Sequence, residues 1–103
     1  MSEHVEKWRL MAADWLDKQQ AADLLRETKN DVFAQIKSKQ NGKSEAEKDR
    51  LARISPEWIE FRDSMVTAEA EARRARLRMK HSEMLFDAWR TEAANNRTER
   101  GRY

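Results

Sequence analysis

A heptad repeat of apolar and small residues in the C-terminal half constrains this chain more than any other feature. From Trp58 onward the repeat positions are separated alternately by three and four residues over five heptads, and neither Gly nor Pro interrupts them. Such spacing keeps one stripe of a helix facing another helix, so it predicts a coiled-coil seam. The seam positions are Trp58, Phe61, Met65, Ala68, Ala72, Ala75, Met79, Ser82, Phe86, Trp89 and Ala93.

Ser55 and Pro56 mark the start of this helix. Proline fits the first turn of a helix, where no partner is needed for the missing N–H, and serine is a preferred N-cap. We therefore expect a helix over residues 56–96. In the tail that follows, residues 98–103, arginine outweighs glutamate and Gly101 weakens the helix. We expect this tail to be flexible and basic, so that a single domain spans residues 1–97.

A second long helix is predicted over residues 3–39, with Ser2 as its N-cap. Its apolar and small residues recur every three or four positions, apart from polar interruptions near Lys18 and Lys29. The polar segment SKQNGKS ends the helix, and Gly42 is the candidate residue just beyond its C-cap. Ser44 and Glu47 then fit a capping box, which predicts a short helix over residues 45–54.

The two long helices are expected to pair as an antiparallel hairpin, because a short connection favours antiparallel neighbours. Their seams match when the numbers of facing residues add up to about 97, which places Trp8 opposite Trp89 and Val32 opposite Met65. The fold class is therefore all-α: a coiled-coil-like helical hairpin with a short connecting helix. The expected hairpin core comprises Trp8, Trp15, Leu25, Val32, Ile36, Trp58, Phe61, Met65, Met79, Phe86 and Trp89.

Several apolar residues lie off this seam, and a two-helix hairpin has only one interface in which to bury them. They suggest that the chain associates with itself, for example as a homodimer in which two hairpins form a helical bundle, or that it binds another protein. The interface candidates are Leu10, Leu24, Phe33, Ile59, Val66, Leu77, Met84 and Leu85.

The basic stretch AEAEARRARLRMKH, residues 68–81, admits two interpretations. In the expected register it faces a part of the first helix that contains Asp14, Asp17 and Asp23, so its cations can set the hairpin register through surface ion pairs. Alternatively, some of them contact the phosphates of a nucleic acid, together with the arginines of the tail. The formal net charge of +2 favours the first interpretation. The nucleic-acid candidates are Arg74, Arg78, Lys80, Arg97, Arg100 and Arg102.

Other chemistry lacks the residues it needs. The chain contains no Cys, its two histidines, His4 and His81, are far apart, and no Gly-rich phosphate loop occurs. We therefore expect no enzyme activity, no metal or other cofactor and no small-molecule substrate. No apolar run is long enough to span a membrane, and the first residues do not resemble a signal peptide, so a cytoplasmic protein without membrane contact is expected.

Three blocks of the sequence resemble a family of small helical proteins encoded by tailed phages and prophages. These blocks are VEKWRLMAADWLD near the start, ISPEW before the last helix and MLFDAWRTEAANNRTE near the end. Genes of this family often lie among early or recombination genes, which implies an accessory role in phage DNA metabolism. The resemblance implies a location in the bacterial host cytoplasm and supplies no catalytic residues.

Three functions are consistent with these observations. The first is a non-enzymatic helical protein that binds a protein partner, either a phage recombination or DNA-metabolism protein or a host factor such as a defence complex. The second is a nucleic-acid-binding accessory protein acting in phage DNA recombination. The third is a structural coiled-coil assembly protein.

Overall fold

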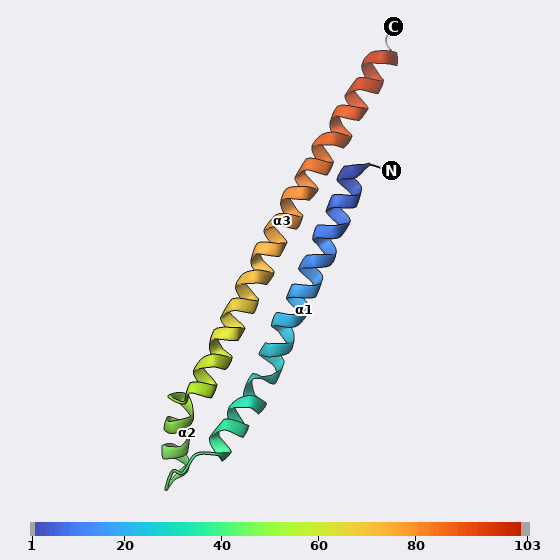
Figure 1. The fold of residues 1–103 in the computed structure, drawn as a ribbon. Helices are drawn as coiled ribbons and strands as arrows, with labels where there is room; N and C mark the ends of the chain where they lie inside the picture. Colours follow the sequence, from blue (N-terminus) through green and yellow to red (C-terminus); the bar gives the residue numbers. More distant parts are fainter. Residues whose placement is uncertain (1, 102–103) are drawn as a thin grey trace.

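The chain folds as an all-α antiparallel hairpin, as the heptad pattern predicts. The computed structural model describes the backbone of residues 2–101 and the side chains of residues 2–98. Helix α1 spans Glu3–Ser38, the short helix α2 spans Glu45–Arg53, and α3 spans Pro56–Gly101. The molecule measures 87 × 17 × 16 Å, and α1 lies alongside α3 with the N-terminus part-way along it (Figure 1).

Each helix begins directly after the serine that the sequence predicts as its N-cap. The Ser2 hydroxyl accepts a hydrogen bond from the His4 N–H at 3.1 Å, and the Ser44 hydroxyl accepts one from the Glu47 N–H at 3.2 Å. The Ser55 hydroxyl accepts a hydrogen bond from the Trp58 N–H at 3.2 Å. These caps satisfy N–H groups that have no partner within the helix, so the predicted starts are confirmed.

The end of α1 differs from the prediction for Gly42. The helix ends at Ser38, and Lys39 caps it in a right-handed helical conformation. No glycine in the described part of the chain has a positive φ, so Gly42 does not act as a left-handed helix terminator. Instead, a Cβ at Gly42 would lie 2.7 Å from the Lys48 backbone nitrogen. The glycine is needed because the loop passes close to α2.

The end of α3 also differs from the prediction. The helix continues to Gly101, where the sequence predicted an end at residue 96 and a flexible tail from residue 98. Arg102 and Tyr103 lie outside the described residues. A glycine in the last turn of a helix weakens it by only about 0.5–1 kcal/mol relative to alanine, which does not force the helix to end earlier.

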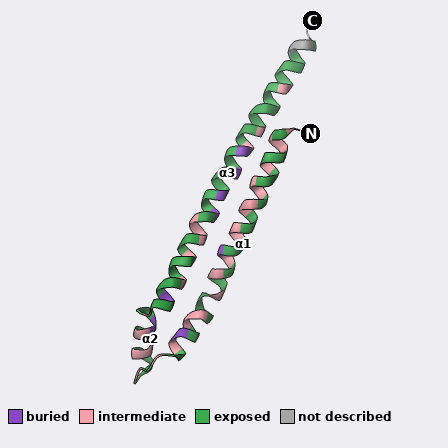
Figure 2. Cartoon of the chain, viewed as in Figure 1, coloured by how far each residue is buried: buried purple, intermediate pink, exposed green. Residues whose placement is uncertain are grey.

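The core is a thin seam between α1 and α3 with a wider cluster at the α2 end (Figure 2). Along the seam, Ala22 and Ala75 are completely buried, and small residues of this kind allow two helices to approach closely. Near the turn, Ile36, Ala52 and Trp58 form a buried cluster to which each helix contributes one side chain. Since no large side chain among the described residues is fully buried, side-chain packing stabilises this fold along a narrow line.

The register agrees with the expected one near the turn, where the residue numbers of the Lys39–Glu57 ion pair add up to 96, and departs from it towards the open end of the hairpin. The pairs Arg26–Glu69, Asp14–Arg78 and His4–Trp89 are in contact, and their residue numbers add up to 95, 92 and 93 rather than 97. Trp89, expected opposite Trp8, has its ring 5.9 Å from that of His4, one turn earlier in α1. Both helices still present their predicted seams to each other.

Two aromatic residues occupy environments that the seam pattern did not predict. Phe33, expected to be free for an interface, is partly buried against the cluster at the turn, with its ring centroid 4.8 Å from that of Trp58 and the Arg53 guanidinium 5.0 Å from it. Short helix α2 brings this cation over Phe33. Trp89, expected to be core, is 40% exposed because α1 begins at Glu3 and covers only one side of the ring.

Candidate functional site

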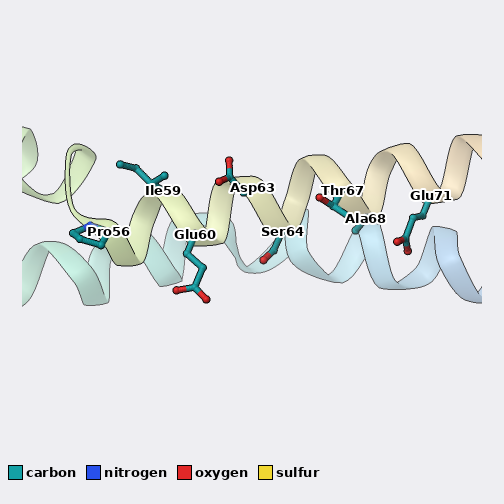
Figure 3. A pocket seen from close by; sticks show the side chains of 8 residues that line it. All are labelled: Pro56, Ile59, Glu60, Asp63, Ser64, Thr67, Ala68 and Glu71. Carbon is teal, nitrogen blue, oxygen red and sulfur yellow. The ribbon is translucent and has the colours of Figure 1, made fainter.

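The hollows on this hairpin are shallow, and none of those lined by described residues assembles catalytic groups. One groove runs along α3 and carries the carboxylates of Glu60, Asp63 and Glu71 (Figure 3). These side chains project from different turns of α3 and do not converge on one point (Figure 3). Without a histidine, a lysine or a buried neighbour, they lack the environment that tunes carboxylates for acid–base chemistry. The groove is lined by Pro56, Ile59, Glu60, Asp63, Ser64, Thr67, Ala68 and Glu71.

The described residues contain neither a cluster of metal-binding side chains nor a helix suited to crossing a membrane. No group of three or more His, Cys, Asp or Glu side chains there lies close enough together to hold a metal ion. Within the same part of the chain, none of the helices combines the length and the apolar character that crossing a bilayer requires.

The outward face of α1 carries leucines that no other helix covers. Leu10 is 64% exposed, and Leu16 and Leu24 are each 60% exposed. Leu16 and Leu24 lie eight residues apart and border one shallow hollow with Gln20 and Glu27. Leu10 and Leu24, both expected as interface candidates, lie fourteen residues apart and therefore on the same side of the helix. Leu16 and Leu24 therefore form the candidate binding surface of α1, and Leu10 lies at its edge, about 120° around the helix from Leu16.

The outward side of α3 carries a second set of uncovered apolar residues. Its most exposed members are Val66, Leu77 and Met84, at 62%, 70% and 69%, while Ile59 is 46% exposed. Leu85, on a neighbouring column of the helix, is 39% exposed. All five were expected as interface candidates, and all five lie on the surface of the hairpin.

Asp14 of α1 lies opposite the basic stretch of α3 and links the two long helices. Its carboxylate accepts a hydrogen bond from Lys18 at 2.6 Å and one from Arg78 of α3 at 3.4 Å. These two cations, Lys18 foremost, lower the pKa of Asp14 below the ordinary value for an aspartate, although partial burial opposes them. Arg76 lies over the Trp15 ring at 5.9 Å. Two of the five cations in the stretch therefore contact α1, which supports their role in setting the register.

The remaining nucleic-acid candidates do not form one patch. Arg74 and Lys80 are exposed and make no ion pair among the described residues, but six residues separate them, which places them about 120° apart around the helix. Arg97 donates a hydrogen bond from Nε to the Ala93 carbonyl at 3.4 Å. The side chain of Arg100 and all of Arg102 lie outside the described residues.

An aromatic group at the open end of the hairpin was not predicted. Phe86 and Trp89 stack with ring centroids 6.0 Å apart, and His4 adds a third ring from α1. The indole N–H groups of Trp8 and Trp15 are buried along the seam and have no hydrogen-bond partner among the described residues. Nothing in the sequence pattern signals these features, because they depend on the register between the helices.

Comparisons with known protein families, with curated proteins and with solved structures find no match to this chain. The geometry and charge of the hairpin surfaces therefore provide the indications of function.

Proposed function

We propose that this chain is a non-enzymatic binding protein that recognises a helix of another protein through the outward face of α1. The observation that supports this proposal is the exposure of Leu16 and Leu24, which border one hollow on a helix whose opposite face is already packed against α3. Exposed apolar side chains on one side of a helix are the usual anchors for a partner helix.

The charges around these leucines indicate the chemistry of the partner. Asp17, Glu27 and Asp31 are exposed on the same side of α1 and make no ion pair among the described residues. A partner helix with apolar residues flanked by Lys and Arg would bury the leucines and match these carboxylates, and the charge match would favour such a partner over an acidic one. The resemblance to phage-encoded proteins adds that the partner is a phage DNA-metabolism protein or a host factor such as a defence complex.

Affinity capture with matched variants tests this function. The tagged chain is recovered from infected host cells after nuclease treatment, alongside the double variant Leu16→Glu and Leu24→Glu. The wild type should retain a protein that the double variant loses, since two buried glutamates would be uncompensated in the complex. Ile54→Glu, at a residue that is 60% exposed and lies outside this face, serves as the control and should retain the partner.

The result has meaning only if the variants fold, so helicity and thermal unfolding are compared by circular dichroism. Binding by the purified partner is then measured by titration calorimetry. A partner bound equally well by wild type and double variant would assign recognition to another surface, and capture of no protein from host cells would reject the function.

Binding to nucleic acid is a second candidate function, favoured by the exposure of Arg73, Arg74 and Lys80 without ion pairs in the described part of the chain. Phosphate contacts release counterions, so affinity for a labelled DNA should fall steeply as salt is raised. Arg73 and Lys80 lie seven residues apart, on one side of α3. The double variant Arg73→Glu and Lys80→Glu should abolish binding, whereas Lys29→Glu with Lys43→Glu makes the same charge change elsewhere and should matter less. Equal affinity of both double variants, measured by fluorescence anisotropy, would reject this surface.

A further inference from the structure

The outward side of α3 carries a second heptad pattern, on the face turned away from α1. Successive members of this outward stripe are separated alternately by four and three residues, as in a coiled-coil seam. In the isolated hairpin seven of its members are exposed, and Ala70 is half-buried. The outward stripe consists of Ile59, Asp63, Val66, Ala70, Arg73, Leu77, Lys80 and Met84.

The order of residues along the outward stripe is symmetric in its chemistry. Counting outward from the point between Glu71 and Ala72, the stripe has apolar residues at equal distances on both sides, Val66 with Leu77 and then Ile59 with Met84. At an intermediate distance an acid on one side, Asp63, corresponds to a base on the other, Lys80. A surface of this kind is complementary to itself after a two-fold rotation.

We infer that two copies of this chain pair antiparallel through the outward stripe of α3, with the two-fold axis between Glu71 and Ala72. Val66 then packs against Leu77 of the second copy, and Ile59 packs against Met84 of the second copy. Asp63 faces Lys80 of the second copy. Every apolar residue of the outward stripe other than Ala70 meets another apolar residue. The two α3 helices then lie side by side, with one α1 helix on the outer side of each.

The charges decide the orientation. In a parallel pair each residue faces its own copy, so that Asp63 would meet Asp63 and Lys80 would meet Lys80, and like charges directly opposite each other destabilise an interface. The antiparallel pair replaces both repulsions by attractions. Charged residues beside the outward stripe also favour the antiparallel orientation. Arg62 and Glu83 make no ion pair among the described residues, and in the antiparallel pair Arg62 of one copy approaches Glu83 of the other.

This inference concerns α3 and the proposed function concerns α1, so each can fail without the other. Cysteine cross-linking tests the pairing directly, because the chain contains no Cys of its own. Val66→Cys and Leu77→Cys are prepared separately, and each is oxidised alone and in an equimolar mixture.

The mixture should yield a disulfide-linked dimer, and each variant alone should remain unlinked. In an antiparallel pair of two Val66→Cys chains, the introduced thiols are eleven residues apart along the axis, or about 16 Å, which is too far for a disulfide. Cross-linking of either variant alone would show a parallel pair and overturn the inference. Leu24→Cys, on α1, is the control and should link to neither variant.

Charge reversal gives a second measurement that does not depend on thiol geometry. Sedimentation equilibrium should give the wild type a mass of twice 12.2 kDa. Asp63→Lys should weaken the dimer at least tenfold, because the introduced lysine then faces Lys80 of the second copy. The double variant Asp63→Lys and Lys80→Asp should restore it, since the opposite charges face each other again. A monomeric wild type, or a double variant as weak as the single one, would overturn the inference.

Discussion

Trp58 of α3 packs against side chains of both other helices. It is 5% exposed, its ring lies 4.8 Å from that of Phe33, and it shares a buried cluster with Ile36 of α1 and Ala52 of α2. Trp58→Ala should lower the free energy of unfolding by about 3–5 kcal/mol, because it removes a large buried ring and leaves a cavity. Urea unfolding followed by circular dichroism measures this loss.

The control for Trp58 is Leu24→Ala, which truncates an exposed leucine of α1 and should change the free energy of unfolding by no more than about 0.5 kcal/mol. If Trp58→Ala and Leu24→Ala had similar effects, the cluster at the turn would not be the main source of stability.

Asp14 should make part of the stability dependent on pH. Because Lys18 and Arg78 lower the pKa of Asp14 in the folded chain, its ionised form stabilises the fold above the pKa of the unfolded chain. That contribution is lost as the pH falls below about 3.9 and through the lowered pKa of the folded chain. Asp14→Asn lacks the charge, so the difference in Tm between wild type and variant should be largest near neutral pH and shrink on acidification.

Thermal unfolding at several pH values between about 6 and about 2 checks this expectation for Asp14. Asp31→Asn is a suitable control, because Asp31 is exposed and makes no ion pair among the described residues. A constant difference in Tm between wild type and Asp14→Asn across this range would contradict the linkage.

Residue environments were only partly predictable. The seam pattern correctly placed Trp58, Met79 and Ile36 in buried positions, because heptad spacing alone decides which side of a helix faces its neighbour. It did not place Phe33 correctly, since the burial of that ring depends on where the short helix α2 folds back. Burial of Trp89 depends on how far α1 extends along α3, and spacing within one helix contains no information about that length.

At the scale of elements, helix starts were predicted more accurately than helix ends. The starts rest on serine hydroxyls that accept defined hydrogen bonds, and each lies where the sequence indicates. The ends lack such a residue: α1 ends at Ser38, before Gly42, and α3 continues to Gly101. The register was predicted only to within about one turn, because alanine-rich seams fit a neighbour nearly as well after such a shift.

The loop between α1 and α2 has a requirement for glycine that can be tested. A Cβ at Gly42 would lie 2.7 Å from the backbone nitrogen of Lys48, and backbone atoms cannot move aside as a flexible side chain can. Gly42→Ala should therefore destabilise the fold by about 1–3 kcal/mol, as overpacking usually does. Thermal or urea unfolding measures the change.

Gly101→Ala is the matched control for this loop, since nothing lies within 4 Å of a Cβ at that position in α3. The same substitution there should leave stability unchanged or raise it slightly, because alanine favours helix over glycine. Equal effects at both positions would mean that the close approach to Lys48 does not constrain the loop.

At the scale of the whole molecule, the hairpin is long and narrow, and its surface is large relative to its core. Its length of 87 Å against a width of 17 Å leaves most side chains in contact with solvent. A second apolar stripe on α3 and exposed leucines on α1 are therefore the features through which such a chain can gain further burial. The heptad pattern predicted that these residues lie off the seam, and the two-fold pairing inferred for α3 rests on their positions relative to the centre of the outward stripe.

The antiparallel pair predicts a distance that the parallel pair cannot produce. Ala88 is exposed on α3 beyond the outward stripe, so a spin label attached to Ala88→Cys should not disturb the interface. With the two-fold axis between Glu71 and Ala72, the two labels are separated by about 33 residues along the helices, or about 50 Å at 1.5 Å per residue. In a parallel pair the same labels would be separated by about 8–10 Å, the distance between neighbouring helix axes, plus the label arms. Pulsed electron-spin resonance distinguishes the two. A single long distance supports the antiparallel pair, and it places the C-terminal ends of the two α3 helices at opposite ends of the dimer.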